Sequence, residues 1–378
     1  MNYSKRIERL RQAMQEAGID GVVFGLGANY QYFTGSVAPW IREGEPLEPD
    51  HLLVVGREGL PTIITVGARV REIVPAEVNI QAAADRAEVI CLLAGLLKGE
   101  RFGVGRQAYA YLPQLVTEAI PGCECMEADG LGEQLRLIKE PDEIARLREV
   151  AGITDRTMTE ILRRIDRGLS QARLQQMILD IGEEYGVQDV SFPPAGLYVK
   201  TGSLPSDNPF TYPKEEGLVM GTSIAFDFGF VLHGYCSDFG RSFYYGAAPA
   251  HIRGAYKALQ EAQVHLISRL KPGLRIGDMP GILLAKLDES GYGDRFRARV
   301  PDGTLGHQIG VDLHENPWIK PETDTLLAPG MVMCIEPKVW SPGEYYLRVE
   351  DMVLITDDGA ESLTGFDRDI FELYPTGA

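Results

Sequence analysis

Two aspartates, Asp227 and Asp238, stand eleven positions apart in the stretch FDFGFVLHGYCSDFGRSF, whose other residues are largely apolar, aromatic or small. We interpret this stretch as a buried β-hairpin with its turn around residues 231–234. Side chains alternate between the two faces of a strand, so a turn with an even number of residues places both acids on the same face. Two neighbouring buried carboxylates repel each other unless one keeps its proton or a positive charge lies between them. The chain must therefore fold so that this pair of acids is neutralised.

A hard divalent cation is the simplest partner, because carboxylate oxygens suit such ions. Two alternatives remain open from the hairpin alone: one aspartate faces solvent, or one pairs with Arg241. The C-terminal half offers further candidate ligands, namely His307 and His314 among glycines and Glu336 and Glu350 in strand-like segments. Each of these residues alone is more often structural. Together, two aspartates, two glutamates and a histidine provide donors for two metal ions bridged by carboxylates.

The pattern of apolar residues divides the chain into two parts. With 378 residues, 44% of them hydrophobic, the chain is long enough for two or three domains. Strands alternate with helices up to about residue 137, which predicts an α/β N-terminal domain over residues 1–137. Pro141 suits the first turn of a long helix that opens the second domain, residues 138–378. This second domain becomes rich in strands after about residue 190 and is predicted to be α+β, with two long helices near 249–270 and 276–290.

Charge and cysteine content exclude several classes of function. A net charge of −17 repels nucleic acid and anionic membranes, so neither is an expected partner. The N-terminus lacks the apolar core of a signal peptide, and no apolar run is long enough to span a bilayer. Five scattered cysteines, an odd number, indicate reduced thiols and a cytoplasmic protein. Two of them, Cys236 and Cys334, lie close to candidate ligands in sequence, and we expect both to face the core rather than the ligands.

The order of the candidate ligands, together with their local motifs, resembles the pita-bread metallopeptidase family M24. The two hairpin aspartates are followed by a histidine in GH-x-IG, a glutamate in G-M-x-x-x-x-EP and a glutamate in R-x-E-D. That family includes methionine aminopeptidases, prolidases, Xaa-Pro aminopeptidases and creatinases. The segments RIERLRQAMQEAGIDGVVFGLGANYQYFTG and LIKEPDEIARLREVAGITDRTM resemble the creatinase/prolidase N-terminal domain and the helix after it. The resemblance implies a creatinase/prolidase-like domain over 1–137 and a pita-bread catalytic domain over 138–378.

The resemblance also implies a ligand set for two divalent metal ions per chain. Asp227 would chelate one ion, Asp238 and Glu350 would bridge both ions, and His307 and Glu336 would complete the shell of the second. Mn²⁺ is the expected metal, while Co²⁺, Zn²⁺ and Fe²⁺ also suit such ligands.

Three residues have implied roles in catalysis. Glu336 would also accept the proton of the bridging water, His314 would contact the substrate near the scissile carbonyl, and Arg348 would orient the carboxylates. The expected reaction is hydrolysis of the bond before proline in small peptides by a metal-bridged hydroxide. The expected assembly is a homodimer.

One stretch departs from the family pattern. Proline-specific members and creatinase carry a further histidine before the first aspartate strand, but residues 197–213 contain none, and Asp207 or Ser206 stands near its place. Asp207 is interpreted either as a proton donor with a raised pKa or as a turn residue before Asn208. The loss leaves two other functions open: a creatinase-like hydrolase or lyase for a small non-peptide solute, and a catalytically inactive binding module.

Overall fold

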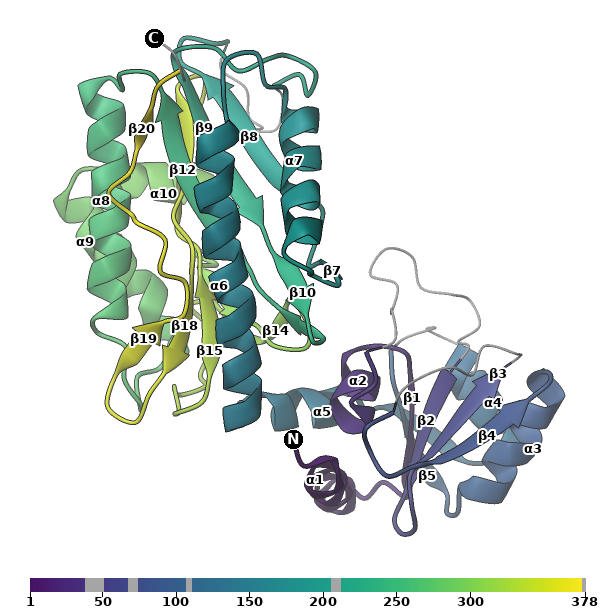
Figure 1. The fold of residues 1–378 in the computed structure, drawn as a ribbon. Coiled ribbons are helices and arrows are strands. Elements are labelled where there is room, and N and C mark those ends of the chain that lie inside the picture. The colour runs from purple at the N-terminus through teal and green to yellow at the C-terminus, as the bar shows by residue number, and fades with distance from the viewer. Residues whose placement is uncertain (38–50, 67–73, 107–110, 205–211, 376–378) are drawn as a thin grey trace. The chain divides into compact units, whose positions relative to one another are not determined.

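The computed structural model describes residues 1–37, 51–66, 74–106, 111–204 and 212–375 (Figure 1). These residues form two compact units, Met1–Leu137 and Ile138–Ala378. No helix among them is long and apolar enough to cross a membrane.

The first unit is built on a six-stranded sheet in the order β4-β3-β2-β1-β5-β6. Its pairs are parallel except β1 with β2 and β2 with β3, which are antiparallel. Helix α1 begins where the Asn2 side chain accepts a hydrogen bond from the Lys5 backbone, and its apolar stripe of Ile7, Leu10 and Met14 is buried. The elements are α1 (Tyr3–Glu16), β1 (Gly21–Gly25), α2 (Ala28–Thr34), β2 (His51–Gly56), β3 (Thr62–Val66), β4 (Asn79–Ala83), α3 (Arg86–Leu96), β5 (Arg101–Val104), α4 (Tyr111–Ala119), β6 (Glu124–Glu127) and α5 (Asp129–Arg136).

The second unit combines long helices with several sheets, which are antiparallel except where β20 pairs with β12 (Figure 1). Its larger sheets have the orders β20-β12-β9-β8 and β14-β13-β15-β18-β19. The elements are α6 (Pro141–Arg164), α7 (Gln171–Glu184), β7 (Asp189–Val190), β8 (Ala195–Lys200), β9 (Thr222–Phe228), β10 (Phe230–Leu232), β11 (Tyr235–Cys236), β12 (Phe239–Tyr245), α8 (Ala250–Ile267), a 3₁₀ turn (Ile276–Asp278), α9 (Met279–Glu289), α10 (Gly293–Arg299), β13 (Gly306–Gln308), β14 (Glu315–Ile319), β15 (Val332–Ile335), β16 (Lys338–Ser341), β17 (Tyr345–Arg348), β18 (Asp351–Ile355), β19 (Ala360–Ser362) and β20 (Glu372–Leu373).

Helix α6 starts as its sequence predicts. Pro141 occupies the first turn, and Glu140 and Glu143 form a reciprocal capping box, which satisfies backbone donors that the helix itself leaves free.

The core of the second unit lies between helices α6 and α7 and the sheet that contains β9 and β12. Helix residues such as Ile161 and Ile178 pack with Phe226, Phe228 and Phe243 of the strands. Because strand side chains alternate, residues between these phenylalanines point to the opposite face of the sheet. Asp227 lies on that opposite face, away from the two helices.

Candidate metal centre

The hairpin of β9 to β12 places its two aspartates on one face, as the sequence predicts. Asp227 pairs with Gly240, and the same register continues through Val231 with Cys236 and ends in the two-residue turn His233–Gly234. Both turn residues have positive φ, 50° and 76°, which two-residue hairpin turns of this kind require. Extended one step, the register sets Asp238 across from Gly229, so the two acids are diagonal neighbours.

A second set of strands brings donors from the end of the chain to the same place. On β13 and β15, His307 and Cys334 are directly opposite each other. Glu336 follows β15 two positions after Cys334. Glu350 lies between β17 and β18, where its backbone N–H donates to the carbonyl of Gly240 at 2.8 Å.

Gly240 has to be small at this crossing. A Cβ there would collide with the side chains of Arg348 and Glu350. The absence of a side chain at position 240 is thus what lets the two strand systems approach.

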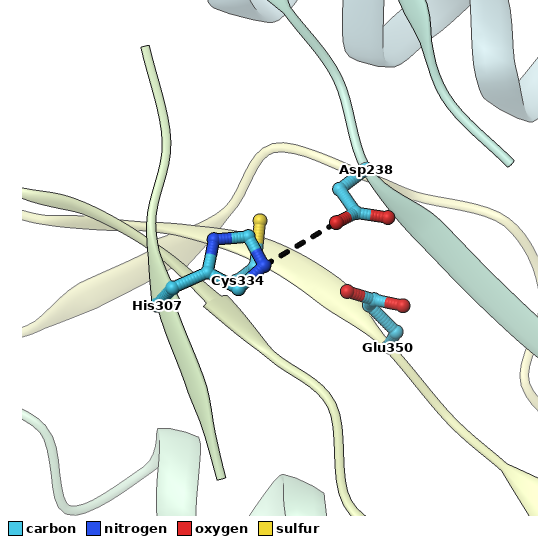
Figure 2. Close-up of side chains that lie close together, drawn as sticks. All are labelled: Asp238, His307, Cys334 and Glu350. Atoms are coloured by element: carbon cyan, nitrogen blue, oxygen red, sulfur yellow. Dashed lines mark ion pairs between the residues drawn. The ribbon is translucent and has the colours of Figure 1, made fainter. Parts of the chain in front are cut away.

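Four buried side chains form the densest group of donors. Ligand atoms of Asp238, His307, Cys334 and Glu350 all lie within 4.8 Å of one another (Figure 2). The two carboxylates and the imidazole point toward a common space, and His307 Nε2 is 3.4 Å from Asp238 Oδ2. His307 Nδ1 donates to the carbonyl of Gln308 at 2.9 Å, which leaves Nε2 as the atom available to an ion.

Two carboxylate oxygens of this group lack partners. Among the described residues, Asp238 Oδ1 and Glu350 Oε1 are buried and accept no hydrogen bond. Leaving such atoms unsatisfied is costly, whereas a cation would satisfy both of them. The donor set therefore fits a divalent metal ion.

Two positively charged side chains, Arg348 and Lys338, contact the remaining predicted ligands. Arg348 forms ion pairs with Asp227 and, at 3.4 Å, with Glu350, and its Nη2 lies 4.0 Å from Glu336. Lys338 Nζ forms an ion pair with Glu336. Asp227 and Glu336 thus lie beside the four-residue group, held there by positive side chains. The alternative in which Arg241 pairs with a hairpin aspartate is wrong, because Arg241 pairs with Asp351 at 2.6 Å.

Burial and charge shift the pKa values of the acids in opposite directions. Burial raises the pKa of Asp238, and it raises that of Glu350 well above the usual range. Burial also opposes ionisation of Glu336, but Lys338 and Arg348 outweigh it and lower the pKa of Glu336 to about 2. At Glu336 the positive side chains outweigh burial, so the carboxylate ionises. At Asp238 and Glu350 burial outweighs the nearby His307 and Arg348, so these acids favour a proton or a metal ion.

The pKa values of the two histidines of the centre shift in opposite directions. Burial favours the neutral ring of His307, but its hydrogen bond with Asp238 outweighs burial and raises its pKa. For His314, loss of water around the ring and the neighbouring His307 lower the pKa. The His314 ring lies 4.5 Å from that of His307 and stacks on Trp318 at 5.1 Å. His314 is therefore held as a neutral ring beside the donor group.

Sequence reasoning missed three residues of this centre: Cys334, Lys338 and Trp318. The expectation that Cys334 faces away from the ligands is wrong, because it shares a strand face with His307, its cross-strand partner. A usable signal existed, since Cys334 and Glu336 are two positions apart and side chains two apart share a face. Asp207 lies outside the described residues.

A buried ion pair supports the segment that carries both histidines. Lys139 Nζ donates to Gln308 Oε1 and Glu315 Oε2, each at 3.1 Å, and the Lys139 and Glu315 side chains are almost fully buried. Gln308 and Glu315 are the residues that follow His307 and His314. Lys139 thus ties the start of the second unit to both ends of this segment.

Comparison with known proteins assigns the family. A model described as metallopeptidase family M24 matches residues 145–357, which is more than half of the chain. The chain belongs to metallopeptidase family M24. A second model, described as the creatinase/prolidase N-terminal domain, matches residues 6–138 of this M24 chain.

Individual relatives cover almost the whole M24 chain. A Bacillus subtilis protein named "Putative dipeptidase YkvY" is 30% identical over 376 residues, which are 97% of this chain and 99% of the relative. A prolidase from Thermococcus sibiricus is 25% identical with a TM-score of 0.85, covering 99% of this chain and 100% of its own. A Xaa-Pro dipeptidase from Bacillus anthracis is 27% identical with a TM-score of 0.85, covering 98% and 100%. The predicted family and fold, an α/β N-terminal domain followed by a pita-bread domain, are confirmed, and the chain is a hydrolase of the M24 metallopeptidase family.

Proposed function

We propose that this protein is a metal-dependent peptidase that hydrolyses the bond before proline in dipeptides or short peptides. The observation that carries the proposal is the pair of buried, unpartnered oxygens of Asp238 and Glu350 beside His307 in the described part of the chain. The names of the relatives, a dipeptidase, a prolidase and a Xaa-Pro dipeptidase, support the choice of substrate.

The centre would hold two divalent ions. Asp238, His307 and Glu350 supply the buried donors, and Asp227 and Glu336 would complete the set. Mn²⁺, Co²⁺, Zn²⁺ and Fe²⁺ are the candidate metals. When bound, such ions acidify a water molecule and polarise a carbonyl oxygen.

The side chains around this set would bind the peptide and move its protons. Glu336 is held ionised by Lys338 and Arg348, so one of its carboxylate oxygens would accept a proton. The neutral ring of His314 can donate an N–H to the oxygen of the scissile carbonyl as negative charge develops there. Arg348, which already contacts three carboxylates, would keep them oriented.

Residues outside the centre complete the proposal. We assign residues 1–137 to a creatinase/prolidase-like domain and 138–378 to the catalytic domain, and we expect a cytoplasmic homodimer. Asp207 would be either a proton donor to the leaving nitrogen or a turn residue.

A second candidate function rests on one observation in the sequence. Residues 197–213 contain no histidine. The resemblance to proline-specific members of the family implies one in this stretch. A small solute with a C–N or C–S bond would be the substrate if that histidine is needed for peptides. The complete donor set argues against an inactive binding module.

A substrate panel separates these functions. Protein loaded with Mn²⁺ or Co²⁺ is assayed with Xaa-Pro dipeptides, longer Xaa-Pro peptides, Xaa-Ala dipeptides, creatine and sulfonium solutes. We expect turnover of Xaa-Pro peptides and loss of it in Asp238→Asn, with Asp189→Asn on the surface of β7 as the matched control. Turnover of a solute with no turnover of any peptide would refute the peptidase proposal.

A further inference from the structure

We propose that the Cys334 sulfur is an additional metal ligand, so the centre selects ions that accept sulfur, such as Co²⁺, Zn²⁺ and Fe²⁺, over Mn²⁺. This inference rests on the proposed metal centre and specifies which metals it takes. The prediction of Mn²⁺ rests on a ligand set that contains only carboxylate oxygens and one imidazole.

The position of Cys334 carries the inference. Its Sγ lies within the 4.8 Å group that contains the ligand atoms of Asp238, His307 and Glu350 (Figure 2). Two donors on opposite sides of one ion are at most about 4.5 Å apart, because a metal ion lies about 2.3 Å from sulfur and about 2.0–2.2 Å from nitrogen or oxygen. The 4.8 Å group is therefore close to the size that one shared ion requires. The strand register fixes the arrangement, since Cys334 is the direct partner of His307 on the adjacent strand.

A second observation points to a ligand at the same place. Asp238 Oδ1 and Glu350 Oε1 are buried without partners among the described residues and belong to the same group. The sulfur thus belongs to a group of donors whose oxygens lack partners and is not an isolated thiol in a packed core.

The other buried cysteine shows the contrast. The Cys236 thiol donates to the carbonyl of Val311 at 3.4 Å and is not a member of the group. The Cys334 thiol makes no hydrogen bond within the ranges that the structure covers. Of the two buried thiols, only that of Cys334 lies among the candidate ligands and makes no hydrogen bond.

Binding would replace a proton by a metal ion. The Cys334 S–H bond breaks, its proton passes to solvent, and the sulfur electron pair forms the bond to the ion; nothing is oxidised or reduced. The ion would supply the positive charge that stabilises the thiolate beside these carboxylates. A thiolate donor favours Zn²⁺ and Co²⁺, whereas Mn²⁺ prefers oxygen ligands.

The test uses the absorption spectrum of the Co²⁺-loaded protein, which does not depend on activity. A thiolate bound to Co²⁺ gives an intense near-ultraviolet charge-transfer band. We expect this band in wild type and in Cys236→Ser, and its loss in Cys334→Ser. The band must also persist in the double variant Cys123→Ser/Cys125→Ser, which removes the only C-x-C pair as a competing site.

Competition binding gives an independent measure. The preference for Co²⁺ over Mn²⁺ should fall on the order of tenfold in Cys334→Ser and stay constant in Cys236→Ser. Full Co²⁺ occupancy of wild type without the band would overturn the inference even if both variants failed to fold, and it would leave the proposed function intact. Failure of wild type to bind any divalent ion would overturn both proposals.

Discussion

Lys338 and Arg348 lie directly opposite each other on β16 and β17, and both point at the carboxylates of the metal centre. Like charges at opposed positions of a sheet repel. They are tolerated here because Asp227, Glu336 and Glu350 surround them. The centre thus carries two fixed positive charges of its own, next to the place where metal ions would bind.

Removal of the lysine charge should tighten metal binding. In Lys338→Met the divalent ion no longer meets the repulsion of a nearby ammonium, while Arg348 still holds Glu336 in reach. We expect the dissociation constant for Co²⁺ to fall by roughly tenfold, since charges a few ångströms apart interact by a few kcal/mol near a protein surface. Isothermal titration with Co²⁺ measures this change. Lys286→Met, on α9 and paired with Glu289, should bind as wild type does, and weaker binding in Lys338→Met would contradict the prediction.

Asp238→Asn should abolish metal binding at the centre. The substitution keeps the shape of the side chain but removes the charge that His307 contacts and that a bound ion would contact. Metal content, measured on dialysed protein, should fall from close to two ions per chain toward zero, and peptidase activity should fall to background. Asp189→Asn changes an exposed acid of the hairpin's neighbour strand β7 and should retain both. A variant Asp238→Asn that kept its metal would rule out a bridging role.

The geometry of the hairpin could be predicted from the sequence, whereas the side chains that surround it could not. Alternation predicted that Asp227 and Asp238 share a face, because that depends only on the parity of a local turn. The alternative in which Arg241 pairs with one of them could not be decided locally, since its actual contact, Asp351, is 110 positions away and depends on long-range packing. Lys338 and Trp318 were missed because their proximity to the centre is set by which strands pair. For Cys334 the spacing of two positions from Glu336 was a local signal.

A helix without an amphipathic stripe cannot be recognised from the periodicity of its sequence. Helix α2 is buried on every side, so its sequence ANYQYFT shows no 3.6-residue pattern. Helices α1 and α4 do carry such stripes, with buried apolar residues at helical spacing. The same limit applies to the first unit's β4 and β6, which are exposed or half-buried edge strands of mixed composition.

Glu350 should make the metal-free protein less stable as the pH rises. Its pKa is raised well above the usual range by burial and by the neighbouring Asp238. A carboxyl group with a folded-state pKa above its unfolded value loses stabilisation as the pH rises through the folded pKa. The free energy of unfolding of Glu350→Gln, relative to wild type, should therefore increase from the ordinary pKa range of glutamate upward. Urea unfolding of metal-free protein at several pH values measures it.

In the presence of metal the comparison reverses, and wild type should be stabilised more than Glu350→Gln. Wild type gains stability from Co²⁺ because the ion binds only the folded state, while Glu350→Gln has lost a ligand and should gain little. Glu361→Gln, an exposed acid paired with Arg148, is the matched control and should follow wild type in both series. A difference between Glu350→Gln and wild type that did not change with pH would contradict the assignment of a raised pKa.

The buried pair of Lys139 and Glu315 should couple stability to metal binding. Removal of one partner leaves an uncompensated buried charge, so Lys139→Met and Glu315→Gln should each cost about 3–5 kcal/mol of unfolding free energy. The double variant should cost clearly less than the two single changes combined, because neither charge then remains unpaired. Lys257→Met, on the surface of α8, should change stability by no more than about 0.5 kcal/mol. Because Lys139 also holds Gln308, next to His307, Lys139→Met should weaken Co²⁺ binding, and strictly additive stability changes would show that the pair does not act as a unit.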